Sequence, residues 1–129
     1  MKGGARTWYF PDGYLPEKKT IGEKKTIGEM EAHEALMLFN TANSKIAVYL
    51  DIYFSDAPPE KDIHILVDKE SVKALRMDYP EDIGGLKIKP LTQYAIRVRS
   101  EIPIVVQFGR LDTTQKNMAY YGSMGFFED

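Results

Sequence analysis

Alternating apolar and polar residues identify the clearest element of the chain, the segment IAVYLDIYF at residues 46–54. A two-residue period is typical of a half-buried strand, because successive side chains point to opposite faces of a sheet. The segments DIHILV (62–67) and QYAIRVR (93–99) repeat this period. We therefore predict three strands, whose apolar phases are Ile46, Val48, Leu50, Ile52 and Phe54, then Ile63, Ile65 and Val67, then Tyr94, Ile96 and Val98.

Shorter apolar or β-rich runs predict further strands at RTWYF (6–10), SVKALRM (71–77) and PIVVQF (103–108). Pro103 occupies the first position of its run, where a strand tolerates proline. Turn-forming residues separate the runs at 11–13, 40–44, 55–59 and 84–85. Seven or eight short, mostly antiparallel strands at this spacing predict an all-β fold, either a sandwich or a barrel.

The segment from Glu29 to Leu38 is ambiguous between helix and strand. Its residues are good helix formers, and a helix would place Glu29 beside His33. The same segment continues into a turn and a strong strand, as the first arm of a hairpin does, and tertiary pairing often overrides propensity.

The stretch 17–28 contains an exact duplication of EKKTIG. Two copies are too few for a solenoid. We interpret the duplication as a solvated loop or hairpin, where added length costs little. The alternative is a charged arm that contacts a partner.

Composition restricts the class of protein. A chain of 129 residues that is 43% hydrophobic fits one globular domain, residues 1–129. The formal net charge of -2 lacks the basic excess of a general nucleic-acid binder. No cysteine is present and no segment has the length of a membrane span or the apolar core of a signal peptide, so we expect a cytoplasmic protein. Lys and Glu outnumber Asn and Gln, which favours a thermostable protein.

Motifs for catalysis and cofactor binding are absent from the sequence. There is no GxGxxG or GxxxxGK for a nucleotide, and no GxSxG around any serine. The two histidines, His33 and His64, are too far apart in sequence to form a paired zinc motif. We therefore expect no cofactor, no metal and no enzymatic activity.

Polar and aromatic residues at the ends of the predicted strands are candidates for a binding site, since β scaffolds usually carry sites there. Trp8 is close in sequence to Asp12, Gly13 and Tyr14. The structural alternative is that Trp8 belongs to the core and that residues 11–13 form a simple turn.

Gln107 interrupts an apolar run in which Val105, Val106 and Phe108 are expected to be buried. A buried amide must find hydrogen-bond partners, which either the fold or a ligand would supply.

Arg110 follows Gly109, which allows a bulge or a close backbone approach. Its planar guanidinium suits carboxylates, phosphates or vicinal hydroxyls. A salt bridge with Asp112 is the structural alternative, and Asp112 with Gln115 also fits a helix capping box.

Several motifs together resemble the sensory rhodopsin transducer family of small prokaryotic proteins, named for a member that partners a microbial rhodopsin. The longest is PIVVQxxRLD, at Pro103–Asp112, with Ser100 three residues before it. The others are WxxxDGYLP at 8–16, HEALMLFN at 33–40, YFSD at 53–56, and Arg76. Phe108 departs from the rhodopsin partner, which has histidine there, and the resemblance does not imply a rhodopsin partner for this chain.

The resemblance implies a β-sandwich, a strand at 33–40, a homotetramer, and a ligand-binding or signal-relay role with sugars or related polar metabolites as ligands. The aromatic residues would stack on a ligand and the polar residues would bond to it. The expected ligand-binding residues are Trp8, Asp12, Tyr14, His33, Glu34, Asn40, Gln107, Arg110 and Asp112.

Three other functions remain open from sequence. The chain could be a pure protein-interaction subunit that docks on a receptor or regulator. It could be an enzyme that uses Glu34 with His33 or Asp112 as an acid and base pair. It could also be a DNA-binding regulator, whose binding would depend on salt.

Overall fold

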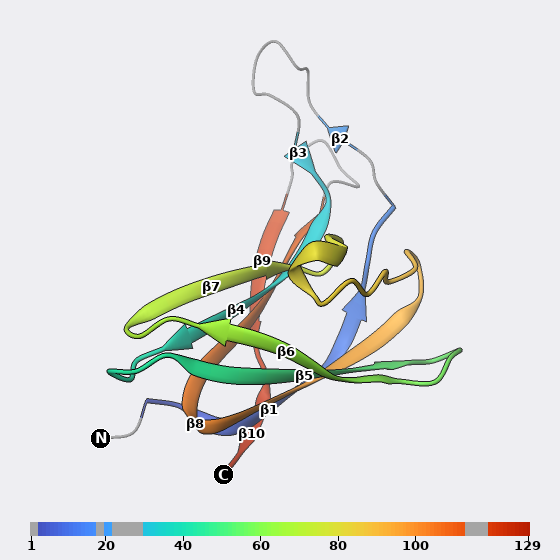
Figure 1. The fold of residues 1–129 in the computed structure, drawn as a ribbon. Helices are drawn as coiled ribbons and strands as arrows, with labels where there is room; N and C mark the ends of the chain where they lie inside the picture. Colours follow the sequence, from blue (N-terminus) through green and yellow to red (C-terminus); the bar gives the residue numbers. More distant parts are fainter. Residues whose placement is uncertain (1–2, 18–19, 22–29, 113–118) are drawn as a thin grey trace.

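One long strand, β8 (Gln93–Asp112), organises the fold and runs through both of its layers (Figure 1). A computed structural model describes residues 3–17, 20–21, 30–112 and 119–129. Eight strands form one antiparallel hydrogen-bonded network, and a separate two-stranded ribbon joins β2 (Thr20–Ile21) to β3 (Met30–Glu31). The architecture agrees with the predicted all-β, single-domain sandwich.

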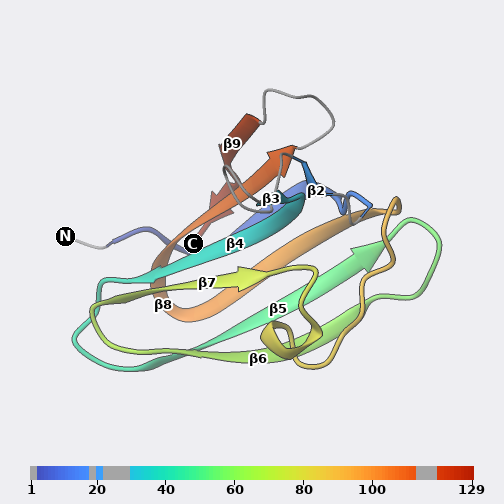
Figure 2. The ribbon, with the colours of Figure 1, turned by 90° about the horizontal axis from the view of Figure 1, so that it is seen from above.

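The first half of β8 lies in one layer and its second half in the other (Figure 2). In the first layer β8 lies between β1 (Ala5–Tyr14) and β5 (Ile46–Phe54), with β10 (Phe126–Glu128) beyond β1 and β6 (Glu60–Val67) beyond β5.

In the second layer β8 lies between β4 (His33–Asn40) and β9 (Ala119–Met124), with β7 (Ser71–Arg76) beyond β4. A short 3-10 turn, η1 (Pro80–Asp82), follows β7. Pairing with β5 ends at Ser100 and pairing with β4 begins at Val105, so the strand changes layer between these residues.

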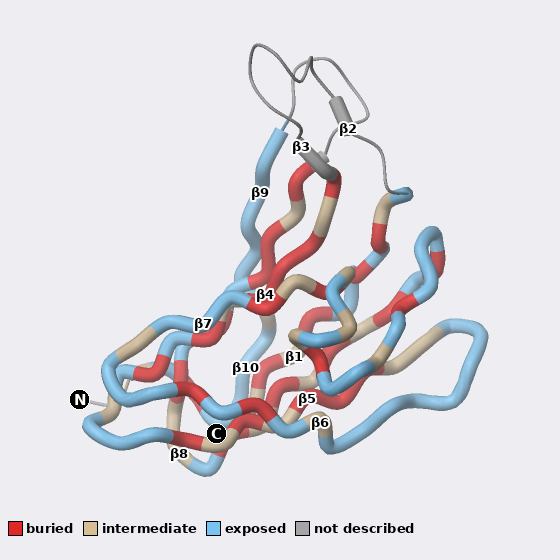
Figure 3. Tube along the Cα trace, turned by 45° about the horizontal axis from the view of Figure 1, so that its top comes forward, coloured by how far each residue is buried: buried red, intermediate tan, exposed pale blue. Residues whose placement is uncertain are grey.

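The core fills the space between the layers, where the inward phases of the strands face one another (Figure 3). The two-residue period of β5 buries Ile46, Val48, Leu50 and Ile52 almost completely. Burial of such side chains contributes about 1.5–3 kcal/mol each. The inward phase also includes Leu36, Leu38, Leu75, Ile96, Val98, Ile104, Val106 and Phe108.

The structure confirms a strand at 33–40 and disfavours the helical alternative for that segment. Backbone pairing of β4 with two neighbours explains why helix propensity is overridden. Glu29 lies outside the described residues, as does most of the EKKTIG duplication. The β2–β3 ribbon flanks residues 22–29.

Three sequence predictions are wrong in detail. Residues 11–13 form a bulge within β1 and not a turn, because β1 advances three residues from Phe10 to Gly13 while β8 advances two, from Ile96 to Tyr94. The runs 93–99 and 103–108 belong to one strand, so Pro103 lies inside β8.

Gln107 and Val105 are exposed and not buried, because β8 keeps a two-residue period there and only Ile104, Val106 and Phe108 point inward.

Candidate functional site

Glu34 is the centre of a polar cluster at the end of the sandwich toward β2 and β3. Its side chain is fully buried, and both carboxylate oxygens accept hydrogen bonds. Oε1 accepts from the Tyr94 hydroxyl at 2.7 Å and from the Tyr14 backbone N–H at 3.0 Å. Oε2 accepts from Nε of Arg110 at 2.6 Å and lies 2.5 Å from Arg110 Nη2. Glu34 therefore connects β1, β4 and β8.

The bulge in β1 and its glycine explain this convergence. Gly13 lies against the Tyr94 ring, and a Cβ at position 13 would be 2.4 Å from that ring. The absence of a side chain at position 13 leaves room for the Tyr94 ring, whose hydroxyl reaches Glu34. The bulge directs the Tyr14 N–H toward the same carboxylate.

Burial and the negative charge of Glu34 determine the protonation states of Tyr94 and Arg110. Burial, together with the charge of Glu34, raises the pKa of the Tyr94 phenol well above its usual range. Burial alone would lower the pKa of Arg110, but the charge and hydrogen bonds of Glu34 more than offset it and raise that pKa. The phenol is thus neutral and the guanidinium charged at neutral pH.

The accessible part of this cluster is a small rim around Arg110. The guanidinium also donates from Nη2 to the Asp12 carbonyl at 3.2 Å and lies over the Tyr121 ring at 5.4 Å from its centroid. The Asp12 carboxylate accepts a bond from the Gln93 side chain, and Tyr14 is 40% exposed. Such a rim has the chemistry to hold a small polar molecule at the surface.

The structure brings together four of the nine predicted site residues, Asp12, Tyr14, Glu34 and Arg110. His33 starts the same strand but occupies its outer phase, opposite Leu111, so its side chain and that of Glu34 leave β4 on opposite faces. This geometry argues against His33 and Glu34 as an acid and base pair. Of Asp112, the structure describes only the backbone, paired with Ala119.

Three predicted site residues, Trp8, Asn40 and Gln107, lie elsewhere, and Gln107 is exposed on β8 opposite Met37. Trp8 is a core residue whose indole N–H donates to the carbonyls of Ala5 and Ile104, both at 3.1 Å. Asn40 is six residues from Glu34, about 20 Å along the strand at ~3.3 Å per residue. Its buried amide holds the turns at either side, donating to Ser44 and Asp68 carbonyls.

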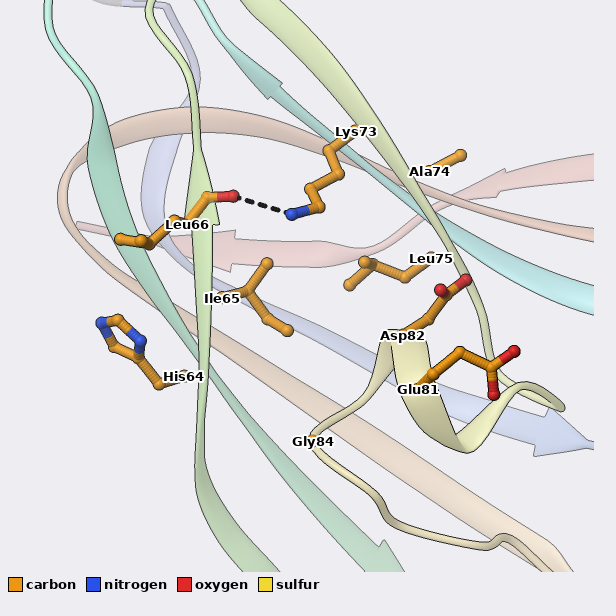
Figure 4. A pocket seen from close by; sticks show the side chains of 9 residues that line it. All are labelled: His64, Ile65, Leu66, Lys73, Ala74, Leu75, Glu81, Asp82 and Gly84. Carbon is orange, nitrogen blue, oxygen red and sulfur yellow. Dashed lines mark hydrogen bonds between the residues drawn. The ribbon is translucent and has the colours of Figure 1, made fainter.

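Among the described residues, hollows also lie away from the polar cluster. One, of about 390 Å³, is an apolar depression on the outer face of the second layer, lined by Met37, Phe39, Val72, Val105 and Gln107. Another, of about 400 Å³, lies between β6 and β7, where Lys73 Nζ donates to the Leu66 carbonyl at 3.1 Å (Figure 4). Its lining includes His64, Glu81 and Asp82, none of which is among the nine predicted site residues.

Sequence reasoning also missed a charged cluster on the outer face of the first layer. Asp51 is fully buried there by Arg97 and Arg99. Nε of each arginine donates to Asp51 Oδ2 at 2.8 Å, and the Arg99 guanidinium also contacts Asp62. The available signal was the alternation of β8, which places both arginines on one face beside the polar phase of β5.

Neither a metal centre nor a membrane span emerges from the described residues. No group of three His, Cys, Asp or Glu side chains among them could hold a metal ion. No helix in this part of the chain is long and apolar enough to cross a membrane.

Comparison with known proteins identifies the family. The crystal structure of Thermotoga maritima 1070 is similar, with a TM-score of 0.77 and 28% identity over 97% of this chain and 96% of that one. The Anabaena sensory rhodopsin transducer is similar at a TM-score of 0.66 and 26% identity, over 84% of this chain and 96% of its own. No curated protein sequence matches. A family model described as Anabaena sensory rhodopsin transducer matches residues 3–127, and the chain therefore belongs to this family.

Proposed function

We propose that the protein is a cytoplasmic, non-catalytic signal-relay module that acts through contacts with other proteins. Family membership supports a relay role, since the similar Anabaena protein is a transducer. The observation that carries the proposal is that both carboxylate oxygens of Glu34 already accept hydrogen bonds from the protein itself. Its carboxylate is surrounded by donors from the chain itself, so the motif residues Tyr14, Glu34 and Arg110 act as a clamp between strands.

The outer face of the first layer has the composition of a partner-binding surface. Tyr9, Tyr49, Tyr53, Arg97 and Arg99 are half-buried neighbours across β1, β5 and β8. Tyr and Arg are enriched where protein interfaces gain most of their binding energy. Asp51 holds both guanidinium groups in place, which lowers the entropy that binding would otherwise cost.

The outer face of the second layer favours self-association. Phe39 is 44% exposed and Val72 is 65% exposed beside the apolar depression. Exposed apolar patches commonly serve as interfaces between subunits. We propose that this face assembles the homotetramer that the family resemblance suggests.

Photo-crosslinking in the native host tests the relay proposal. A photoreactive amino acid replaces Tyr53 on the first layer in one strain and Phe39 on the second layer in another. We expect position 53 to give one adduct with a different protein, and position 39 to give an adduct with a second copy. The purified partner should bind with a Kd that Arg97→Asp raises about tenfold or more. Adducts with copies alone at both positions would contradict the relay proposal.

A small polar metabolite is the second candidate function, favoured by the partly exposed Arg110 over Tyr121. A ligand at 100 times its Kd stabilises by about 2.7 kcal/mol, which raises Tm by several degrees. Thermal unfolding with a panel of sugars and related metabolites would reveal such a shift. A shift that Tyr121→Ala abolishes would support this function over the relay.

A further inference from the structure

Strand β10 covers the outer edge of β1 while burying little of itself. Thr7, Trp8 and Tyr9 pair with Glu128, Phe127 and Phe126. Phe126 is 75% exposed and Phe127 is 61% exposed. In Figure 3 this strand is coloured as exposed along its length, whereas buried residues recur along its neighbour β1. The edge of β1 is therefore occupied, but by a segment that adds little to the core.

Specific side-chain contacts accompany the backbone pairing. The Phe127 ring lies on Trp8, with centroids 5.2 Å apart. The Tyr9 hydroxyl donates to Glu128 Oε1 at 2.6 Å, and the Arg6 backbone N–H donates to Asp129 Oδ1 at 3.1 Å. This edge thus recognises an aromatic ring followed by two carboxylates.

The short connection between β9 and β10 would let β10 leave the edge of β1 while β9 stays paired with β8. β9 pairs with β8 in the second layer through six residue pairs, from Gln107–Met124 to Asp112–Ala119. Gly125 alone connects it to β10 in the first layer. A Cβ at Gly125 would be 2.6 Å from the Tyr9 carbonyl oxygen, so the chain crosses β1 only because this residue has no side chain.

Neighbouring charges suit an acidic occupant. In the register of the first layer, Thr7 lies between Glu128 and Arg99, and Tyr9 lies between Phe126 and Arg97. Both arginines belong to the outer face described above. A carboxylate at the Glu128 position of an incoming strand would lie on the same face as these ion-paired arginines, and one at the Asp129 position would accept from the Arg6 backbone N–H.

We propose that the edge of β1 is a docking site for an extended strand of a partner protein, and that residues 126–129 occupy it until the partner displaces them. The partner strand presents an aromatic residue at the Phe127 position and carboxylates at the next two. Strand addition to a sheet edge gives affinity through main-chain bonds and specificity through alternate side chains. This inference rests on the proposed relay function and names the partner's chemistry.

Rescue by a peptide tests the proposal on the full chain. Trp8 is the only tryptophan, so its emission reports on the Phe127 contact. We expect Phe127→Ala combined with Glu128→Gln to shift this emission to the red, with an unchanged circular dichroism spectrum. An end-blocked peptide GFFED, copied from residues 125–129, should restore it.

Competition provides the quantitative result. A short tether gives an effective concentration on the order of millimolar, so the wild-type chain should bind GFFED about tenfold more weakly than the double variant. The peptide GFAQD should not bind. Phe126→Ala is the matched control, because Phe126 pairs with Tyr9 and its ring leaves β10 on the face opposite to that of Phe127. This variant should resemble the wild type. If the double variant is poorly folded, Gly125→Val displaces β10 by steric conflict and takes its place.

Three results would overturn the proposal: no red shift, no restoration by GFFED, or equal affinity for wild type and variant. Restoration of the Gly125→Val emission by raising the concentration of that variant without peptide would show that the occupant is a second copy, because this variant keeps residues 126–129 intact, and it would also overturn the proposal. Failure here would leave the adduct at position 53 intact, whereas failure of the relay proposal would remove that adduct.

Discussion

At the residue scale, a buried carboxylate between two strands determines what the motif residues do. Glu34 is not exposed to solvent, and its acceptors are used by Tyr14, Tyr94 and Arg110. An unpaired buried charge is costly, so each donor in this set is needed for stability. Their polar side chains made Glu34 and Arg110 candidates for ligand binding in the sequence, and in the structure the same polar groups are used by each other and by the chain.

Glu34→Gln should destabilise the fold strongly. The amide keeps the size of the side chain, but it removes the charge that Arg110 requires and turns one acceptor into a donor. Breaking a buried ion pair costs about 3–5 kcal/mol, which urea unfolding would measure. Asp12→Asn is the control, since its exposed side chain keeps the bond from Gln93 and should change stability by less than about 0.5 kcal/mol. A loss below about 1 kcal/mol for Glu34→Gln would refute the clamp.

Asp51 should make stability depend on pH in the acid range. Burial would raise the pKa of Asp51, but hydrogen bonds from Arg99, the Asp62 backbone and Arg97 reverse this and lower it well below its usual range. The folded carboxyl stays ionised when the unfolded one takes up a proton, below about pH 4. Its contribution is therefore present above about pH 4 and is lost as pH falls further.

The free energy of unfolding of wild type and Asp51→Asn, measured from pH 6 to pH 2, checks this sign. The difference between the two proteins should shrink as pH falls below about 4. Asp56→Asn, in an exposed loop, should follow the wild type throughout. A difference that stays constant over the whole range would contradict the assigned charge pairing.

Sequence reasoning found the Glu34 cluster only in part. Glu34 and Arg110 were identified from motifs, but their pairing requires knowing that β4 and β8 are neighbours, which residue spacing does not reveal. Tyr94 was assigned to a buried phase, and its hydroxyl was the unused signal, because a buried phenol needs a partner. The prediction that Gln107 is buried was wrong, because in a run of apolar residues the sequence does not show which ones face outward.

At the element scale, β8 shows why strands were easier to predict than their connections. Periodicity and short β-rich runs located β1, β5, β6, β7 and both halves of β8, because burial of one face imposes such patterns. Strands β9 and β10 are exposed along their length, carry no such pattern and were not predicted. The layer change between Ser100 and Val105 has no such period, so one strand resembled two. The ProAspGly bulge resembled a turn, since both need residues that tolerate irregular backbone.

Gly4 should be the glycine most sensitive to substitution near the segment in which β8 changes layer. Its φ is +94°, and a Cβ would lie 1.8 Å from the Ile104 carbonyl oxygen. Gly4→Ala should cost about 2–4 kcal/mol from backbone strain and displacement of β8. Gly85→Ala isolates the cost of backbone strain, because Gly85 has a similar φ of +88° but a Cβ there would meet nothing within 4 Å. This variant should cost about 1 kcal/mol. Equal losses in thermal unfolding would show that the contact with Ile104 is unimportant.

At the scale of the whole molecule, the sandwich exposes two faces of different chemistry. The first layer presents tyrosines and ion-paired arginines, whereas the second presents Met37, Phe39, Val72 and Val105. Charged groups held by partners remain compatible with water, which suits a surface that binds and releases. An apolar face is costly to leave in water, which suits permanent assembly. The two faces thus favour different kinds of contact.

Self-association through the second layer predicts a specific pattern of variants. Light scattering after size exclusion should give the wild type a mass of four chains of 14.7 kDa. Phe39→Asp and Val72→Asp should each reduce this mass, because burying an unpaired carboxylate at an apolar contact costs several kcal/mol. Leu66→Asp is the control, since Leu66 is 46% exposed on β6 in the other layer and should leave the assembly intact.

A wild type that stays monomeric, or a Leu66 variant that dissociates while the Phe39 variant does not, would refute this face as the subunit interface. Because the β1 edge lies in the other layer, an assembly formed in this way would leave β10 and the arginine row accessible to a partner.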